Sequence, residues 1–319
     1  MTRFAVVGLG LIGGSVLRRL AAERVDAAGW DPDATVRREA SAAGLAVADD
    51  PAGITDVQTV VVGAPPAASA RAITDALARW PEAVVFDTAS VKTPIAVALR
   101  SEGRGRVLLG HPLAGSERAG FAASDSALFE GAVWAACPLA ENPVERLCDL
   151  SVLTDALGSR IAVLSPERHD SLVARTSHVP HLVAAALAAS AVGNDPLAAV
   201  LSGGALRDMT RVARADAGLW EEILRLNRPQ VLDALAAFGE RLDSLEAGDL
   251  REGWSEGAEA ASLLHRLRWG ETTAHEERHA LAAGWEPWLA LSAKGATLSC
   301  VRREADVIAA RVARPPRSP

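Results

Sequence analysis

Two polar side chains follow strand-like segments in positions that suit acid–base chemistry on a hydroxyl group. His111 comes just after the apolar segment 106–109 and precedes a proline. A neutral imidazole there could accept a proton from a substrate hydroxyl while a hydride leaves the same carbon. Ser90, at the end of the neighbouring strand-like segment, could bind the same hydroxyl or orient His111. Structural roles are equally open, since a histidine can bond the backbone at a strand end and a serine can cap the next helix.

A second polar group interrupts an apolar helical pattern over residues 172–187. Ser177, His178 and His181 lie within it, and histidines three residues apart share one face of a helix. Such a pair could bind a metal, but further ligands at suitable spacing are missing from the sequence, so we expect no metal site. We expect these side chains to point into a cleft, with one of the two histidines buried in the core.

Charged residues near these segments could bind an acidic substrate. Arg211 is the first candidate to hold a carboxylate, because its planar guanidinium matches carboxylate geometry. Arg207 is the second candidate, although it could instead pair with Asp208. Glu117 could belong to the polar surroundings of the site, whereas we expect Lys92 to be an exposed charge.

The chain begins with a pattern typical of dinucleotide binding. An apolar segment at 4–7 precedes three glycines with G-x-G-x-x-G spacing, and a helical pattern follows from 15 to 20. The first glycine allows a tight turn, the second lets a pyrophosphate approach the backbone, and the third lets the helix pack on the strand. The positive end of the helix dipole would face the anion. The expected cofactor-binding residues are Gly8, Gly10, Leu11, Ile12 and Gly13.

A carboxylate after the second predicted strand indicates which dinucleotide binds. Asp31 stands eighteen residues after Gly13, where an acid binds the adenosine ribose hydroxyls. A carboxylate there repels a 2′-phosphate, so we predict NAD rather than NADP. Arg37 and Arg38 could serve a 2′-phosphate, which leaves NADP as the less favoured alternative. Pro65, after the third predicted strand, lies at the same edge of the sheet.

Strand and helix patterns divide the chain into three parts. Their alternation up to Pro166 predicts an α/β, doubly wound, Rossmann-type domain with a parallel sheet, in residues 1–166. Helical patterns alone then predict an all-α substrate and dimerisation domain in residues 167–268. The extension 269–319 has no clear role from its sequence, and we expect its end, 314–319, to be disordered. The substrate site should lie between the first two domains.

One helical segment of the second domain carries an apolar stripe. Val231, Leu235, Phe238, Leu242 and Leu245 alternate at spacings of four and three residues. A stripe of this kind is typical of a core or a subunit interface. Because helical domains of this kind often dimerise, we expect a homodimer.

Composition excludes several classes of function. The net charge of -7 gives no basic surface for nucleic acid. No apolar run approaches the roughly 18 residues that span a membrane, and the absence of tyrosine excludes a phenolic proton donor. The first strand begins almost at residue 1, and the three cysteines have neither metal-type nor disulfide-type spacing, so we expect a cytoplasmic protein.

Together the motifs resemble the prephenate dehydrogenase family, including its arogenate-using members. The matching segments, in chain order, are 8–15, 87–92, 111–117, 177–181, 204–211 and 220–227. The resemblance spans roughly residues 3–245. It implies an NAD(P)-dependent oxidative decarboxylation of a cyclohexadienol and a homodimer built through the helical domain.

The resemblance also implies a role for each candidate residue. His111 would accept the ring hydroxyl proton with help from Ser90, as hydride passes to the nicotinamide. Loss of carbon dioxide then makes the ring aromatic. Arg211 would bind a substrate carboxylate, and the remaining pocket residues would be His178, His181 and Glu117. The expected reaction converts prephenate to 4-hydroxyphenylpyruvate in tyrosine biosynthesis.

Alternatives stay open at this point. The same chemistry could act on arogenate, or on 4-amino-4-deoxyprephenate in an antibiotic pathway. A different two-domain reductase could share the glycine loop, and a non-catalytic NAD sensor would need neither His111 nor Arg211. Beyond about residue 267 the sequence shows no clear match to the small regulatory domain that some relatives carry, so it leaves feedback regulation by tyrosine open.

Overall fold

The apolar segments of the first half of the chain form neighbouring strands of one sheet. The structure, a computed structural model, describes residues 3–116, 118–193, 195–269 and 272–315. The strands are β1 (Phe4–Val7), β2 (Ala27–Trp30), β3 (Thr59–Val62), β4 (Val84–Asp87), β5 (Val107–Pro112), β6 (Val133–Cys137) and β7 (Arg160–Val163). The helices between them are α1 (Leu11–Ala22), α2 (Ala34–Ala42), α3 (Pro66–Arg79), α4 (Thr93–Ala98) and α5 (Arg146–Ala156).

The sheet is mixed, which corrects the prediction that it is parallel throughout. Strands β1 to β5 are parallel in the order β2-β1-β3-β4-β5, as expected. Strand β6 runs antiparallel to β5, with Leu109 opposite Cys137 and His111 opposite Ala135. A parallel neighbour needs a crossover, usually a helix, whereas the described part of this connection has only the short turn Phe121–Ala123. The helix α5 then makes β7 parallel to β6.

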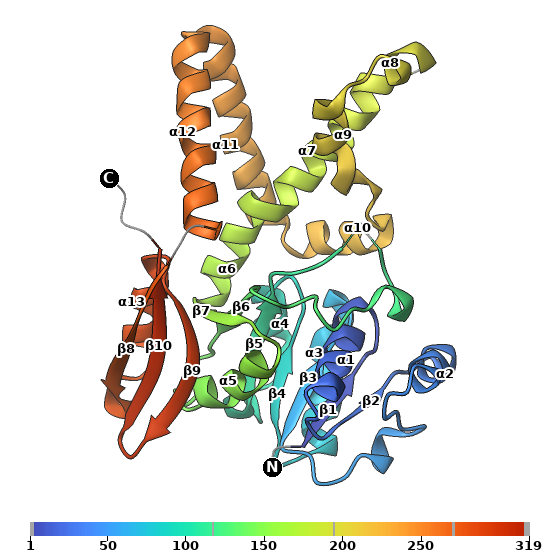
Figure 1. The fold of residues 1–319 in the computed structure, drawn as a ribbon, viewed down its shortest axis with the longest axis vertical. Helices are drawn as coiled ribbons and strands as arrows, with labels where there is room; N and C mark the ends of the chain where they lie inside the picture. The colour runs from blue at the N-terminus through green and yellow to red at the C-terminus, as the bar shows by residue number, and fades with distance from the viewer. Residues whose placement is uncertain (1–2, 117, 194, 270–271, 316–319) are drawn as a thin grey trace.

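Helices follow β7 without interruption by strands. They are α6 (Pro166–Val173), α7 (Val179–Val192), α8 (Pro196–Val200), α9 (Gly204–Thr210), α10 (Ala217–Leu226), α11 (Arg228–Ala247) and α12 (Leu250–Trp269). A wide turn, Ala174–His178, joins α6 to α7, and a tight turn, Arg211–Arg214, precedes α10. Figure 1 shows α11 and α12 projecting from the sheet as one arm and α7 to α9 as another.

The apolar stripe of α11 is covered at its start, exposed in its middle and half-buried at Leu245. Val231 is 5% exposed, whereas Leu235, Phe238 and Leu242 are 38%, 37% and 50% exposed. Large apolar side chains gathered on a surface mark an interaction site. The stripe therefore belongs to a surface that a second molecule could bury.

The C-terminal extension, whose role the sequence left open, continues the sheet. Its elements are β8 (Thr273–Ala280), α13 (Glu286–Ala293), β9 (Thr297–Glu304) and β10 (Val307–Arg314). Strand β9 joins β7 in antiparallel orientation, and the full order is β2-β1-β3-β4-β5-β6-β7-β9-β10-β8. Residues 316–319, part of the segment that we expected to be disordered, lie outside the described residues.

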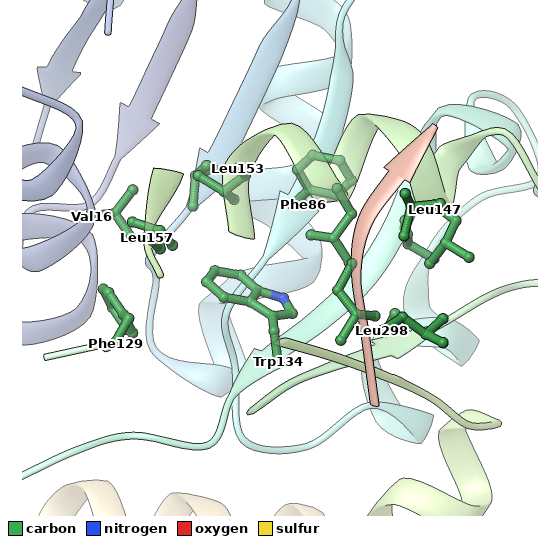
Figure 2. Packing of buried hydrophobic residues seen from close by; sticks show 14 of the residues in the cluster. Val16, Phe86, Phe129, Trp134, Leu147, Leu153, Leu157 and Leu298 are labelled. Carbon is green, nitrogen blue, oxygen red and sulfur yellow. The ribbon is translucent and has the colours of Figure 1, made fainter. Parts of the chain in front are cut away.

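Core packing joins the extension to the first domain. Leu298 of β9 and Trp288 of α13 are fully buried in the same cluster as Trp134 of β6. Figure 2 shows Trp134 among side chains of β4, α5 and β9. A second cluster, with Val62, Ile73 and other residues of the strands, α3 and α4, fills the opposite face. Burial on both faces explains the continuous apolar runs of the strands.

The helices of the described residues include none that is both long and apolar enough to cross a membrane.

The shared core predicts that the extension unfolds together with the first domain. Val312 of β10 is fully buried, so Val312→Ala should lower the free energy of unfolding by about 1.5–3 kcal/mol. Urea unfolding followed by circular dichroism would measure this change. Val97→Ala is the matched control, because Val97 is 80% exposed. Equal, small effects of the two substitutions would mean that the extension separates from the core before the core unfolds.

Candidate active site

A cavity of about 1350 Å³ lies where the carboxyl ends of the parallel strands meet the helical part. It brings together most of the residues selected from the sequence. Residues of its nucleotide side are Gly8, Gly10, Leu11, Ile12, Asp31 and Pro65; residues of its helical side are Ser177, His178, His181, Arg211 and Trp220. Ser90 and His111 line it from the ends of β4 and β5. This position matches the rule that ligands bind beyond the carboxyl ends of such strands.

The glycine loop forms a cradle that a dinucleotide phosphate could occupy. Gly8 has a φ of 87°, a conformation that side chains disfavour. A Cβ on Gly13 would lie 1.8 Å from the carbonyl oxygen of Gly8, so only glycine allows α1 to pack this closely. A Cβ on Gly10 would instead project into open space next to the N-terminus of α1. These features fit a dinucleotide cofactor.

Asp31 is held rigidly at the end of β2. Its Oδ2 accepts a hydrogen bond from the backbone of Leu9 at 2.7 Å, and its Oδ1 accepts one from Asp33 at 2.8 Å. Arg37 donates to the backbone oxygen of Asp31 at 2.7 Å, and Arg38 bonds the Thr35 hydroxyl at 3.1 Å. Both arginines therefore have partners within the protein, while Asp31 lines the cavity.

His111 lies at the junction between the nucleotide side and the helical side. Its Nδ1 is 2.9 Å from Nε2 of His169, which leaves Nε2 of His111 as the ring nitrogen without this partner. Burial holds the pKa of His111 well below its ordinary value of 6.5, and the neighbouring His169 and the charge of Lys92 lower it further. His111 is therefore neutral near pH 7 and able to accept a proton.

His169 and Asp170 are candidate functional residues that the sequence analysis missed. His169 Nδ1 lies 2.8 Å from Asp170 Oδ1, and both residues are buried in the middle of α6. The carboxylate of Asp170 also accepts hydrogen bonds from the backbone of Lys92 and Thr93 at 2.8 Å each. A usable signal was present: two adjacent polar residues, His169 and Asp170, stand four and three residues before Val173 in a helix that begins shortly after a strand.

Lys92 is buried, which corrects the expectation that it is an exposed charge. Its side chain has no solvent exposure, and Nζ lies 2.5 Å from both Asp87 Oδ2 and the carbonyl oxygen of Gly110. Asp87 Oδ1 in turn accepts a hydrogen bond from the Gly110 backbone at 2.9 Å. This network, which we call the Lys92–Asp87 pair, ties β4 to the residue before His111.

The helical side offers one donor and one acceptor from its two histidines. Asn227 donates to the backbone oxygen of Asp170 at 2.9 Å and, through the same nitrogen, to Nδ1 of His178 at 3.1 Å. Nε2 of neutral His178 must therefore carry the proton, and burial lowers the pKa of His178 to about 4.

His181 donates from Nδ1 to the carbonyl oxygen of Ser177 at 2.8 Å, which leaves its Nε2 as an acceptor. His178 is the more buried histidine, and His181 stacks on Trp220 with ring centroids 3.7 Å apart.

The candidate carboxylate-binding residues differ in position. Arg211 lines the cavity, and its charge helps lower the pKa of His181, after the larger effect of burial. Arg207 is not a lining residue; it is exposed and pairs with Asp208 at 3.1 Å. Glu117, which we expected near the substrate, lies outside the described residues. Among the residues described, no group of histidine, cysteine and acidic side chains is arranged to hold a metal ion.

The Lys92–Asp87 pair predicts a large cost for removing one charge. Lys92→Met leaves the Asp87 carboxylate buried without a countercharge, so we expect a loss of about 3–5 kcal/mol in unfolding free energy. Lys92→Met with Asp87→Asn removes both charges and should recover part of this loss. The measurement is urea unfolding, and the control is Arg71→Ala, which removes an exposed ion pair with Asp75 and should change little. A loss for Lys92→Met as small as that of the control would contradict the importance of the pair.

Comparisons with known proteins agree with this geometry. The model described as "Prephenate dehydrogenase, nucleotide-binding domain" matches residues 14–163, and "Prephenate dehydrogenase, dimerization domain" matches residues 165–254. A cyclohexadienyl dehydrogenase of Zymomonas mobilis is 32% identical over 247 residues, which cover 73% of this chain and 84% of the relative.

Solved structures show the same arrangement. Prephenate dehydrogenase from Aquifex aeolicus, solved in complex with hydroxyphenyl propionate and NAD+, matches with a TM-score of 0.70 and 26% identity, covering 83% of this chain and 96% of that one. Arogenate dehydrogenase from Synechocystis matches with a TM-score of 0.67 and 26% identity, covering 82% of this chain and 97% of that one. The matches to both domains, together with the 32% identical relative, show that this chain belongs to the prephenate dehydrogenase family of oxidoreductases.

Proposed function

We propose that the protein catalyses the NAD-dependent oxidative decarboxylation of prephenate to 4-hydroxyphenylpyruvate. The observation that carries the proposal is the position of His111. This neutral imidazole lies between a glycine cradle suited to a dinucleotide and a pocket that contains Arg211. The names of the relatives, which include prephenate and cyclohexadienyl dehydrogenases, support the same reaction class.

In the proposed reaction His111 and Ser90 act on the ring hydroxyl. NAD, when bound, accepts a hydride from the ring carbon that carries this hydroxyl. Nε2 of His111 takes the hydroxyl proton at the same time, and the Ser90 hydroxyl hydrogen-bonds the oxygen. The carboxylate on the opposite ring carbon then leaves as carbon dioxide, and its bonding electrons make the ring aromatic. His111 returns the proton to the phenolic oxygen, so the cycle consumes one NAD and releases no net proton.

The helical side of the cavity would bind the acidic end of the substrate. Arg211 would pair with a carboxylate, and His178 and His181 would supply a donor and an acceptor. The described carboxylates that line the cavity are Asp31 and Asp75, which lie on β2 and α3 of the first domain. Described residues thus provide a cation but no anion on the helical side. This charge pattern favours the keto side chain of prephenate over the ammonium group of arogenate.

Cofactor choice and assembly form part of the proposal. The fixed carboxylate of Asp31, together with the internal partners of Arg37 and Arg38, favours NAD over NADP. The exposed stripe of α11, within the matched dimerization domain, favours a homodimer through the helical part. We propose the functional division 1–166 for nucleotide binding and 167–268 for substrate binding and dimerisation. The role of 269–319 would be structural, as an extension of the sheet.

Turnover measurements test the substrate directly. NADH formation is followed with prephenate, arogenate and 4-amino-4-deoxyprephenate, each with NAD and with NADP. We expect the highest kcat/KM for prephenate with NAD. A preference for arogenate or 4-amino-4-deoxyprephenate would support the same type of reaction but assign the enzyme to a different pathway. Binding of NAD without turnover of any of the three would contradict the proposal and support an NAD sensor.

The proposed base predicts a specific pH dependence. His111 acts only when neutral, so kcat/KM should fall as the pH drops through its pKa, and burial places this fall below pH 6.5. His111→Asn should lower kcat by roughly 10²-fold or more and remove this acidic limb, with NAD affinity largely retained. Steady-state kinetics over a pH series and NAD titration measure these effects. Full turnover by His111→Asn would assign proton transfer to another group.

A further inference from the structure

We propose that Asp170 and His169 set the protonation state of the catalytic histidine, so that His111 presents an unprotonated Nε2 to the cavity. His169 would thus be a positioning residue that acts through His111. This inference rests on the proposed function only where it concerns turnover. The assignment of protons can be tested without any substrate.

The donor and the acceptor of each hydrogen bond can be assigned starting from Asp170. Its Oδ1 accepts from the backbone of Lys92, and its Oδ2 accepts from the backbone of Thr93, both at 2.8 Å. Burial acts to raise the pKa of Asp170, but hydrogen bonds from His169 and Thr93 outweigh it and hold the pKa below its ordinary value. An ionised carboxylate can only accept hydrogen bonds. The contact at 2.8 Å therefore requires that His169 Nδ1 carries a proton.

The next bond transmits this constraint to His111. Burial is the largest cause that lowers the pKa of His169, so the imidazole is neutral and carries a single ring proton. With that proton on Nδ1, Nε2 of His169 is an acceptor. It lies 2.9 Å from Nδ1 of His111, and the two rings meet edge to face at 71°. The bond thus forms only when His111 is protonated on Nδ1, which leaves its Nε2 free.

Without these hydrogen bonds from Asp170 through His169, the proton of neutral His111 would be distributed between its two ring nitrogens. A molecule with the proton on Nε2 has no lone pair facing the cavity and cannot accept a proton from the substrate. After proton uptake, the His111 imidazolium would keep its bond to His169, and charge makes such a bond stronger. The chain thus serves both the resting state and the charged state of the base.

The same residues also connect the two domains. The carboxylate of Asp170 accepts hydrogen bonds from the chain at the start of α4, and its carbonyl oxygen accepts one from Asn227 at the start of α11. A loss of activity in a variant could therefore reflect a displaced domain. The test needs a signal from the protonation of His111 itself and a variant that restores only the acceptor.

We would record 15N NMR spectra of the full-length protein with 15N-labelled histidine, identifying His111 by its absence in His111→Asn. We expect His111 to show a protonated Nδ1 and an unprotonated Nε2. His169→Leu removes the acceptor, so its His111 spectrum should move toward a mixture of tautomers. The Gln side chain of His169→Gln can place an oxygen near the former Nε2, which should restore the wild-type pattern. An unprotonated Nδ1 in the wild-type protein would overturn the proposal, even where the variants fail to fold.

Kinetics provide the second readout. His169→Leu should lower kcat by roughly 10²-fold with little change in KM or NAD affinity, and His169→Gln should recover much of the loss. Equal losses in both variants, with the His111 tautomer unchanged, would show a purely structural role and overturn the inference. A wild-type protein with the expected spectrum but no turnover of any test substrate would contradict the proposed function and leave the proton assignment standing.

Discussion

The position of His111 depends on the buried Lys92–Asp87 pair. Two opposite charges without solvent exposure are costly to bury, and the structure offsets this cost with further hydrogen bonds. Lys92 donates a hydrogen bond to the carbonyl oxygen of Gly110, and Asp87 accepts one from the N–H of Gly110. Gly110 has to be glycine, because a Cβ there would lie 2.4 Å from Nε1 of Trp134. The backbone before His111 is thus restrained on both sides, and pairing of β5 with β6 places His111 itself opposite Ala135.

A second restraint joins the domains at the same place. The carboxylate of Asp170 belongs to the helical part, yet two of its three hydrogen bonds come from the chain at the start of α4. Asn227 links the backbone of Asp170 to His178, so residues far apart in sequence share one polar network. The two sides of the cavity are therefore joined by hydrogen bonds close to His111.

Local patterns in the sequence were sufficient for the elements and for part of the site. The glycine loop and the apolar runs predicted β1 to β7, because buried strands and tight turns impose requirements on adjacent residues. The predicted orientation of β6 was wrong, because it depends on the connection between β5 and β6, whose sequence has no regular helix or strand pattern. Lys92 was misjudged because a lysine is usually exposed, and its burial depends on Gly110 of the neighbouring strand β5 as well as on Asp87, five residues earlier. His169 escaped notice since its contact with His111 joins residues 58 positions apart.

Neutral histidines reconcile two demands on this cavity. An acidic substrate is attracted by positive charge, but a histidine that is already protonated cannot accept a proton. Burial, the largest cause in each case, lowers the pKa values of His111, His169, His178 and His181. Positive charge on the helical side can then be left to Arg211, which lines the cavity. The arginine would hold the substrate by charge while the histidines hold it by hydrogen bonds, so binding of an anion does not compete with proton transfer at His111.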